Sequence, residues 1–90
     1  MKTNIKHRAI RRLNIIQGQV GGLTKMVENE AYCIDIITQT SAIIEALAGV
    51  ERLVLENHLS THVIEQIRSK DDATATKEIL AVYKLAQKGR

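Results

Sequence analysis

The feature that most constrains the fold is one long segment, residues 31–69, in which apolar side chains recur at helical spacing. The chain contains no proline, so none interrupts a helix over this segment. The apolar positions follow two stripes of that helix, one through Ile37 and Ile44 and the other through Ile43 and Leu47. A helix that is apolar on more than one side needs more than one packing partner. We therefore expect it to pack against its own chain and against a second subunit.

Two further helices are expected, one before and one after the long segment. Apolar residues recur in steps of three and four over residues 5–29, and a third helix is expected to run to about Gln87. The polar stretch 69–74 predicts a turn, with Asp71 or Asp72 as the cap of the third helix. No segment has the pattern of a strand. We therefore expect an all-α fold, with a three-helix protomer that forms a single domain over residues 1–90.

Basic charge is concentrated in the first third of the chain. Residues 1–27 hold six basic and no acidic side chains, a net charge of +6, whereas residues 28–90 hold seven basic and ten acidic ones, a net charge of −3. Such a segment in a small protein indicates a polyanionic partner. The basic residues of this segment are Lys2, Lys6, Arg8, Arg11, Arg12 and Lys25.

Targeting and redox signals point to the cytoplasm. The N-terminus is polar and basic without an apolar core, so we expect no signal peptide. We expect no membrane span either, because no uninterrupted apolar stretch reaches the ~20 residues that a bilayer requires. The single cysteine gives no disulfide within the chain, and a lone thiol stays reduced in the cytoplasm.

Three side chains have the chemistry of a metal site: Cys33, His58 and His62. His58 and His62 are four residues apart, which places two imidazoles on one helix face. One thiolate and two imidazoles suit Cu(I), Zn(II), Ni(II) or Co(II). Three ligands suit Cu(I) best, because Zn(II) usually takes a fourth. Chance spacing and a buried structural cysteine are the competing explanations.

The position of Cys33 indicates that such a site is shared between two chains. Cys33 precedes His58 by 25 residues in the same expected helix, a separation of roughly 37 Å at the α-helical rise. A straight helix cannot close this gap, whereas an antiparallel second copy can. The two chains would cross near residues 46–47, where the small residues Ala46, Ala48 and Gly49 cluster. The geometry therefore predicts an intersubunit metal site.

Enzymatic activity is not expected. Cys33 with a histidine could form a nucleophile pair. The sequence has no oxyanion loop, no orienting Asn or Asp motif and no glycine-rich phosphate loop after a strand. A thiol enzyme is therefore the weakest of the classes considered.

With these residues in view, the chain resembles the CsoR/RcnR/FrmR family of small helical bacterial repressors. The similarity runs from about residue 5 to residue 87 and includes RRLNIIQGQVGGLTKMVENEAYCIDIITQTSAI and VLENHLSTHV. The resemblance implies an antiparallel four-helix-bundle dimer that assembles as a dimer of dimers. It also implies binding to operator DNA without inducer, and release when inducer binds.

The resemblance also bears on the inducer. Copper-sensing members usually have Cys–His–Cys at the three ligand positions, and His62 replaces the second cysteine here. Nickel- and cobalt-sensing members have Cys–His–His and a further histidine near the N-terminus. His7 is the nearest candidate for that position, but it lies further along the chain among basic residues, which favours a surface or phosphate contact over a ligand and leaves its part in the site open. Tyr32, and Glu78 near the start of the third helix, match positions that support the ligand histidine in copper-sensing relatives. We therefore expect Cu(I) first, with Ni(II), Co(II) or Zn(II) as alternatives.

The resemblance implies DNA contacts as well. Arg12 and Arg52 occupy positions that carry DNA-contacting arginines in family members. Lys6, Arg8 and Arg11 share the acid-free first segment and are expected to contact phosphates. The expected function is thus a metal-responsive transcriptional repressor. A helical protein that buffers metal without binding DNA is the alternative class.

Overall fold

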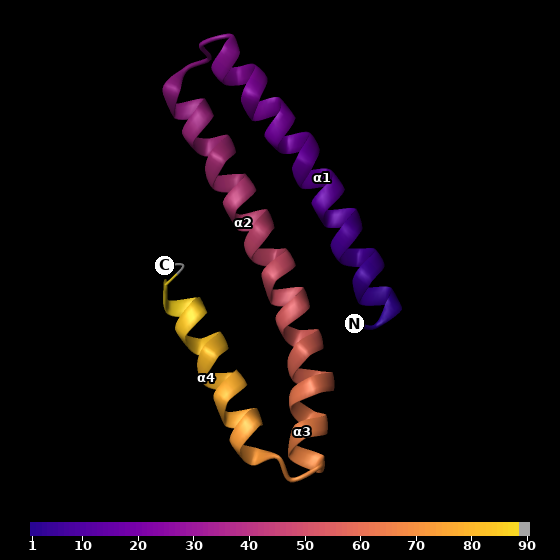
Figure 1. Ribbon diagram of the computed structural model, residues 1–90. Helices are drawn as coiled ribbons and strands as arrows, with labels where there is room; N and C mark the ends of the chain where they lie inside the picture. The colour runs from indigo at the N-terminus through magenta and orange to yellow at the C-terminus, as the bar shows by residue number, and fades with distance from the viewer. Residues whose placement is uncertain (89–90) are drawn as a thin grey trace. The chain divides into compact units, whose positions relative to one another are not determined.

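The structure is a computed structural model that describes residues 1–88, and all regular elements of this part are helical (Figure 1). These elements form three continuous helical stretches. The middle stretch consists of α2, η1 and α3, since no non-helical residue separates them. Each predicted helix bound lies within two residues of the observed one. The expected all-α, three-helix protomer is therefore confirmed. The elements are α1 (Thr3–Glu28), α2 (Cys33–His58), the π-helix η1 (Leu59–Val63), α3 (Ile64–Arg68) and α4 (Asp72–Lys88).

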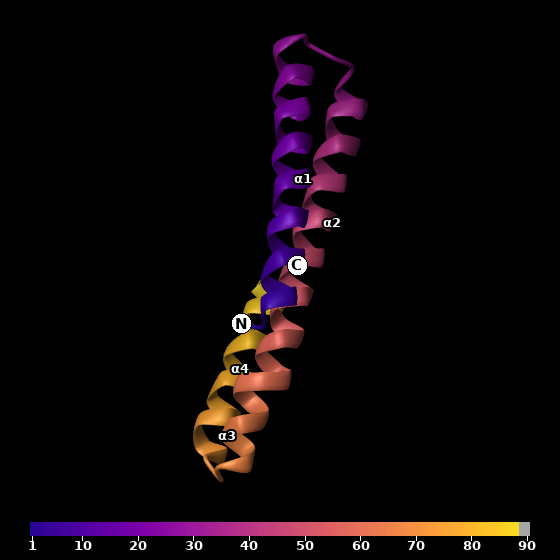
Figure 2. The same cartoon turned by 90° about the vertical axis from the view of Figure 1, so that its right-hand side faces the viewer.

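The chain divides into two compact units, Met1–Leu55 and Glu56–Arg90. In the first unit, α1 and the greater part of α2 run antiparallel and side by side (Figures 1 and 2). Ala9 and Ile16 are buried on α1, and Ile43 and Leu53 on α2. This small apolar seam holds the hairpin together.

Many large apolar side chains of the first unit remain exposed. On α2, Ile37 is 58% exposed and Ile44 is 62% exposed, whereas Ile43 is buried. Leu47, on the same stripe as Ile43, is 45% exposed, so the hairpin buries only part of one of the two stripes predicted for the long helix. The uncovered stripe is what the sequence assigns to a second subunit.

In the second unit, η1 and α3 pack against α4. Val63 and Ala75 are buried there, together with the polar side chain of Asn57. The backbone N–H of Thr74 donates to Asp71 Oδ1 at 3.3 Å. Asp71, one of the two predicted caps, is thus the residue that caps α4.

Both connections between helices use a left-handed residue that is not glycine. After α1, Glu30 has φ 51°. Its N–H donates to the carbonyl of Val27, and the N–H of Ala31 donates to that of Met26. After α3, Lys70 has φ 63° and sits in the same arrangement. These are Schellman motifs, in which a residue with a Cβ carries a conformational penalty of about 1 kcal/mol.

One helical stretch bears on the expectation that the chain has no membrane span. The helical stretch Cys33–Arg68 spans 36 residues and is long and apolar enough to cross a bilayer, by length and composition alone. The expectation was based on uninterrupted apolar runs, which scattered polar residues divide. The mean hydropathy of the helix stays high enough to meet the criterion all the same. The core helix of a soluble bundle meets the same criterion, so the observation is weak evidence for a membrane.

Candidate metal and DNA sites

The two histidines lie next to each other at the start of the second unit. His58 is the last residue of α2, and His62 lies within η1. Their ring centroids are 5.2 Å apart and the ring planes are tilted by 32°. His58 is half-buried and His62 is exposed. The predicted spacing therefore does bring two imidazoles onto one accessible surface.

The helix between these histidines is not the regular α-helix that the sequence predicted. The N–H of Ile64 donates to the carbonyl of Leu59, five residues earlier, as in a π-helix. Ser60 Oγ and Thr61 Oγ1 both donate to the carbonyl of Asn57, at 3.2 and 2.6 Å. Hydroxyls that bond backbone carbonyls compete with the helical ladder. The adjacent Ser60 and Thr61 were the signal that a periodicity argument overlooks.

Glu78 of α4 holds His58. His58 Nε2 lies 2.8 Å from Glu78 Oε2, with about a third of each side chain exposed. In the tautomer that donates from Nε2–H to Glu78 Oε2, the ring has its lone pair on Nδ1. The ring is thus oriented with Nδ1 available to a metal. Glu78 lies in the second turn of α4, further from its start than the sequence predicted.

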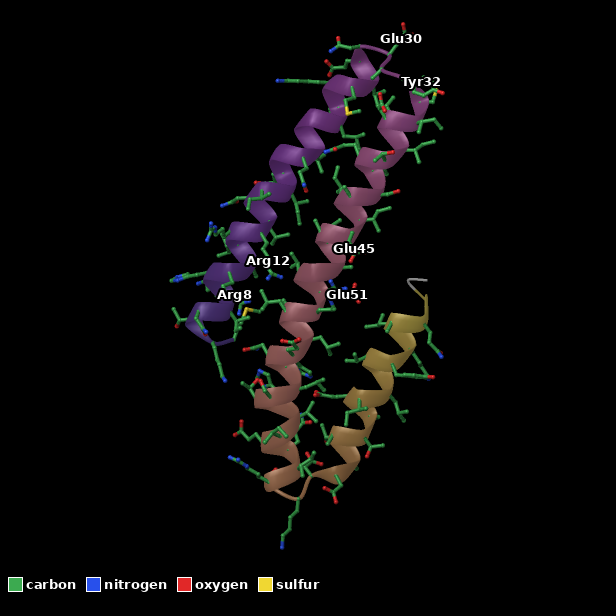
Figure 3. All side chains as sticks on the ribbon, turned by 180° about the vertical axis from the view of Figure 1, so that it is seen from behind. Arg8, Arg12, Glu30, Tyr32, Glu45 and Glu51 are labelled. Atoms are coloured by element: carbon green, nitrogen blue, oxygen red, sulfur yellow. The ribbon has the colours of Figure 1, made fainter. Side chains whose placement is uncertain are left out.

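Cys33 and Tyr32 belong to the first unit, at the opposite end of α2 from His58. Cys33 is the first residue of α2 and is exposed. Tyr32, at the turn between α1 and α2 (Figure 3), has a 70% exposed side chain. Its carbonyl accepts the N–H groups of Asp35 and Ile36. Over residues 1–88, no group of three His, Cys, Asp or Glu side chains that could hold a metal is found within the one chain.

Two arginines of the first unit converge over Gly49. Arg12 Nη1 donates to the carbonyl of Gly49 at 3.3 Å. A Cβ placed on Gly49 would lie 3.7 Å from Arg12 Nη1 and 3.9 Å from Arg52 Nη2. Arg52 also forms an exposed ion pair with Glu45, at 3.7 Å. Arg8 and Arg12 both project from the N-terminal half of α1 (Figure 3), where Lys6 and Arg11 are likewise exposed.

Comparison with known proteins gives these features a context. The family described as metal-sensitive transcriptional repressor matches residues 5–85 of the chain. The chain is 42% identical over 79 residues to the copper-sensing transcriptional repressor CsoR of Bacillus subtilis. That match covers 88% of this chain and 78% of the relative. The CsoR of Mycobacterium tuberculosis is 32% identical, with 88% of this chain and 66% of the relative covered.

A solved structure agrees with the fold. The copper-sensing repressor CsoR of Geobacillus thermodenitrificans, crystallised with Cu(I), matches with a TM-score of 0.88 at 37% identity. The match covers 97% of this chain and 91% of that one. The chain therefore belongs to the metal-sensitive transcriptional repressor family, and the resemblance noted in the sequence is confirmed.

Proposed function

We propose that this protein is a Cu(I)-responsive transcriptional repressor, which binds operator DNA without metal and releases it when Cu(I) binds between two subunits. The observation that carries the proposal is the His58–His62 pair, with His58 Nε2 engaged by Glu78 and Nδ1 left available. It occurs in a chain whose relatives are named copper-sensing repressors.

The proposed ligands are Cys33 of one protomer and His58 and His62 of its partner. Cys33 stands 25 residues before His58 along the chain, in a different compact unit. Its exposure at the first residue of α2 leaves the thiol accessible to a second subunit. The antiparallel pairing inferred from helix length supplies the missing sulfur to the imidazole pair.

The donor set fits Cu(I). A thiolate is a soft ligand and imidazole a borderline one, and three such donors satisfy Cu(I) without a fourth. When bound, the metal would supply bonds that tie two subunits together at this point. Zn(II) prefers four donors, and the hard oxygen ligands that Mg²⁺ or Ca²⁺ require are not part of this set.

The chain's own residues provide the coupling to DNA. Glu78 fixes the orientation of His58, so any displacement of that ring is passed to α4. Tyr32, next to Cys33 in sequence, is proposed to complete this support across the subunit contact. Metal binding and DNA release are then linked through one conformational equilibrium, with a coupling free energy of about 1–3 kcal/mol.

DNA contacts are proposed for the exposed basic side chains of the first unit. Arg12 and Arg52 approach the same point above Gly49, so the two cations could bind one phosphate between them. The proposed set is Lys6, Arg8, Arg11, Arg12 and Arg52. Because phosphate contacts release counterions, we expect affinity to fall steeply with salt.

The assembly we propose is an antiparallel dimer that pairs into a dimer of dimers, with both compact units acting as one domain. The exposed apolar stripe of α2 is the surface available for this contact. We propose a cytoplasmic location and no enzymatic role, since the relatives are transcriptional repressors.

The test is metal-dependent DNA release. The reduced protein is bound to a labelled promoter fragment with an inverted repeat, and buffered Cu(I), Ni(II), Co(II) or Zn(II) is added. We expect binding at low salt and release by Cu(I) at the lowest free concentration relative to its availability in cells. His62→Ala should weaken the metal response and leave DNA binding intact.

Two results would contradict the proposal. A protein that binds Cu(I) but ignores the promoter fragment is a metal buffer. A protein that releases DNA at lower relative concentrations of Ni(II), Co(II) or Zn(II) belongs to the same family but senses another metal.

A further inference from the structure

We propose that His7, Arg11 and Asn14 form a second phosphate-contacting face of α1. This face binds a different segment of the operator backbone from the one that Arg12 and Arg52 contact. The inference rests on the proposed function, since it concerns the same DNA-binding activity. It adds His7 and Asn14 to the contacts proposed above and divides those contacts into two faces.

The spacing of these three residues places them on one side of α1. They follow one another in steps of four and three residues, the separations at which helical side chains are neighbours. All three side chains are exposed. Together with Ile10 and Ile15 they line one hollow in the surface of the first unit. An imidazole, a guanidinium and a carboxamide therefore face the same region of solvent.

Each of the three side chains donates hydrogen bonds. A guanidinium has five N–H donors, a carboxamide has two, and an imidazole has at least one in both its neutral and its protonated form. Within residues 1–88, none of the three side chains has a hydrogen-bond or ion-pair partner. Arg12, by contrast, bonds the Gly49 carbonyl, and Arg52 pairs with Glu45. A phosphate that binds the second face therefore displaces no protein partner from these donors.

Arg11 and Arg12 point in different directions, because consecutive residues of a helix are rotated by about 100°. Arg8 lies four residues before Arg12 and shares its face, whereas His7 lies four residues before Arg11 and shares the other. The N-terminal half of α1 thus presents two groups of donors in two directions. Each group is expected to contact its own stretch of the sugar-phosphate backbone.

The charge of the segment favours DNA over a second copy of this face. No acidic side chain precedes Glu28 in the chain, so the face has no carboxylate on its own helix within reach. In a two-fold symmetric subunit contact the same patch meets itself, which would bring two basic patches together. Phosphates supply the opposite charge, and the exposed aliphatic side chains of Ile10 and Ile15 are available to pack against the adjoining sugars.

The first test compares alanine variants of the whole, metal-free protein in binding to the labelled promoter fragment with an inverted repeat. His7→Ala and Asn14→Ala should each weaken binding by about threefold or more, since each loses hydrogen bonds to phosphate. Asn14→Ala should leave the slope of log affinity against log salt unchanged, because an amide carries no charge. Arg11→Ala should lower that slope by about one unit. Gln87→Ala, which removes an exposed amide from the other unit, is the control.

Unfolding should not account for these losses. Alanine favours helix more than histidine or asparagine does, and both positions are exposed, so the His7 and Asn14 variants should keep the wild-type helix content. Circular dichroism measures that content. Cu(I) affinity, measured by chelator competition, should also match the wild type in both variants, because the proposed metal ligands are other residues.

The second test identifies the phosphates that each face contacts. Promoter fragments that carry one neutral methylphosphonate in place of a single phosphate are bound to the wild type and to each variant. A replacement that weakens binding of the wild type but has no further effect on Asn14→Ala marks a phosphate that Asn14 contacts. The phosphates marked in this way for Asn14 and for Arg12 should differ. If they coincide, the division into two faces is wrong.

The outcomes separate this inference from the proposed function. If the wild type binds the fragment and Arg12→Ala weakens binding, but the His7 and Asn14 variants bind as tightly as the wild type, the second face is wrong and the repressor function stands. If those two variants change the oligomeric state in sedimentation and leave DNA affinity unaltered, the face is a subunit contact and the inference is wrong. If the wild type ignores the fragment, the proposed function fails and this inference fails with it.

Discussion

The two compact units of this protein differ in what their side chains offer. Met1–Leu55 is a hairpin of regular α-helices that carries the acid-free basic segment and the Arg12–Gly49 contact. Glu56–Arg90 contains the π turn, the two adjacent imidazoles and the carboxylate that orients one of them. The clustered basic side chains and the paired imidazoles are thus segregated along the chain.

Cys33 is the exception to this division. The thiol lies in the unit that carries the arginines proposed to contact DNA, whereas the imidazoles lie in the other. A site that needs all three ligands must therefore connect the two kinds of unit. An allosteric repressor requires such a connection, because metal binding at one surface must change the affinity of the other surface for DNA.

The largest expected effect tests whether the thiol and the imidazoles come from different chains. Cys33→Ala and His58→Ala/His62→Ala should each lower Cu(I) affinity by more than about a hundredfold, beyond the effect typical of supporting residues. Refolding the two variants together should restore some tight sites. In mixed dimers, one of the two sites receives both its thiol and its imidazoles, so about a quarter of the wild-type capacity should return.

Tight Cu(I) binding is counted by chelator competition on the mixture and on each variant alone. His7→Ala is the matched control, a third imidazole outside the proposed set, and should keep full capacity. No recovery in the mixture would mean that each chain builds its site alone, and the antiparallel pairing would be wrong.

The next largest effect concerns DNA. Arg12→Ala should weaken operator binding about tenfold and reduce the slope of log affinity against log salt by about one unit, because one phosphate contact is lost. Cu(I) affinity should not change. Lys25→Ala, in the last turn of the same helix, is the control. An equal loss in both variants would mean that net charge, and not the converged arginines, governs affinity.

Glu78→Ala should have an intermediate effect that links the two activities. Without its acceptor the His58 ring loses its fixed orientation, so Cu(I) affinity should fall about tenfold while DNA affinity is kept. The amount of DNA released at saturating Cu(I) should also fall, because α4 is no longer tied to the ligand. Full release at saturation would show that the coupling runs through another residue.

Much of this arrangement was predictable from the sequence. Periodicity gave the helix bounds because the apolar stripes are long and no proline intervenes. The pair His58 and His62 followed from its spacing, and Asp71 was one of two candidate caps. These features depend on residues close together in the chain, where local geometry decides the outcome.

What the sequence did not predict depends on choices between nearly equal backbone states. The π turn at Leu59–Val63 arises where two hydroxyls compete with the ladder, and periodicity cannot detect a shift of one residue. Arg52 pairs with Glu45, seven residues earlier, although Glu51 and Glu56 are nearer in the sequence. The left-handed Glu30 and Lys70 lacked the usual glycine signal.

The smallest expected effect concerns the left-handed residues Glu30 and Lys70, and it tests whether the two units unfold in one transition. Lys70→Gly should stabilise the metal-free protein by about 1 kcal/mol, because glycine adopts φ near 63° without the penalty that a Cβ brings. Lys70→Ala, which removes the charge but keeps the Cβ, is the control and should give no such gain. Denaturant unfolding at fixed protomer concentration measures both.

Glu30→Gly, at the equivalent position of the other unit, completes the comparison. If the units unfold as one, the two glycine variants should shift the same single transition by similar amounts. Two transitions, each moved by only one of the variants, would mean that the segregated units are also independent in stability. Metal binding would then be the main link between them.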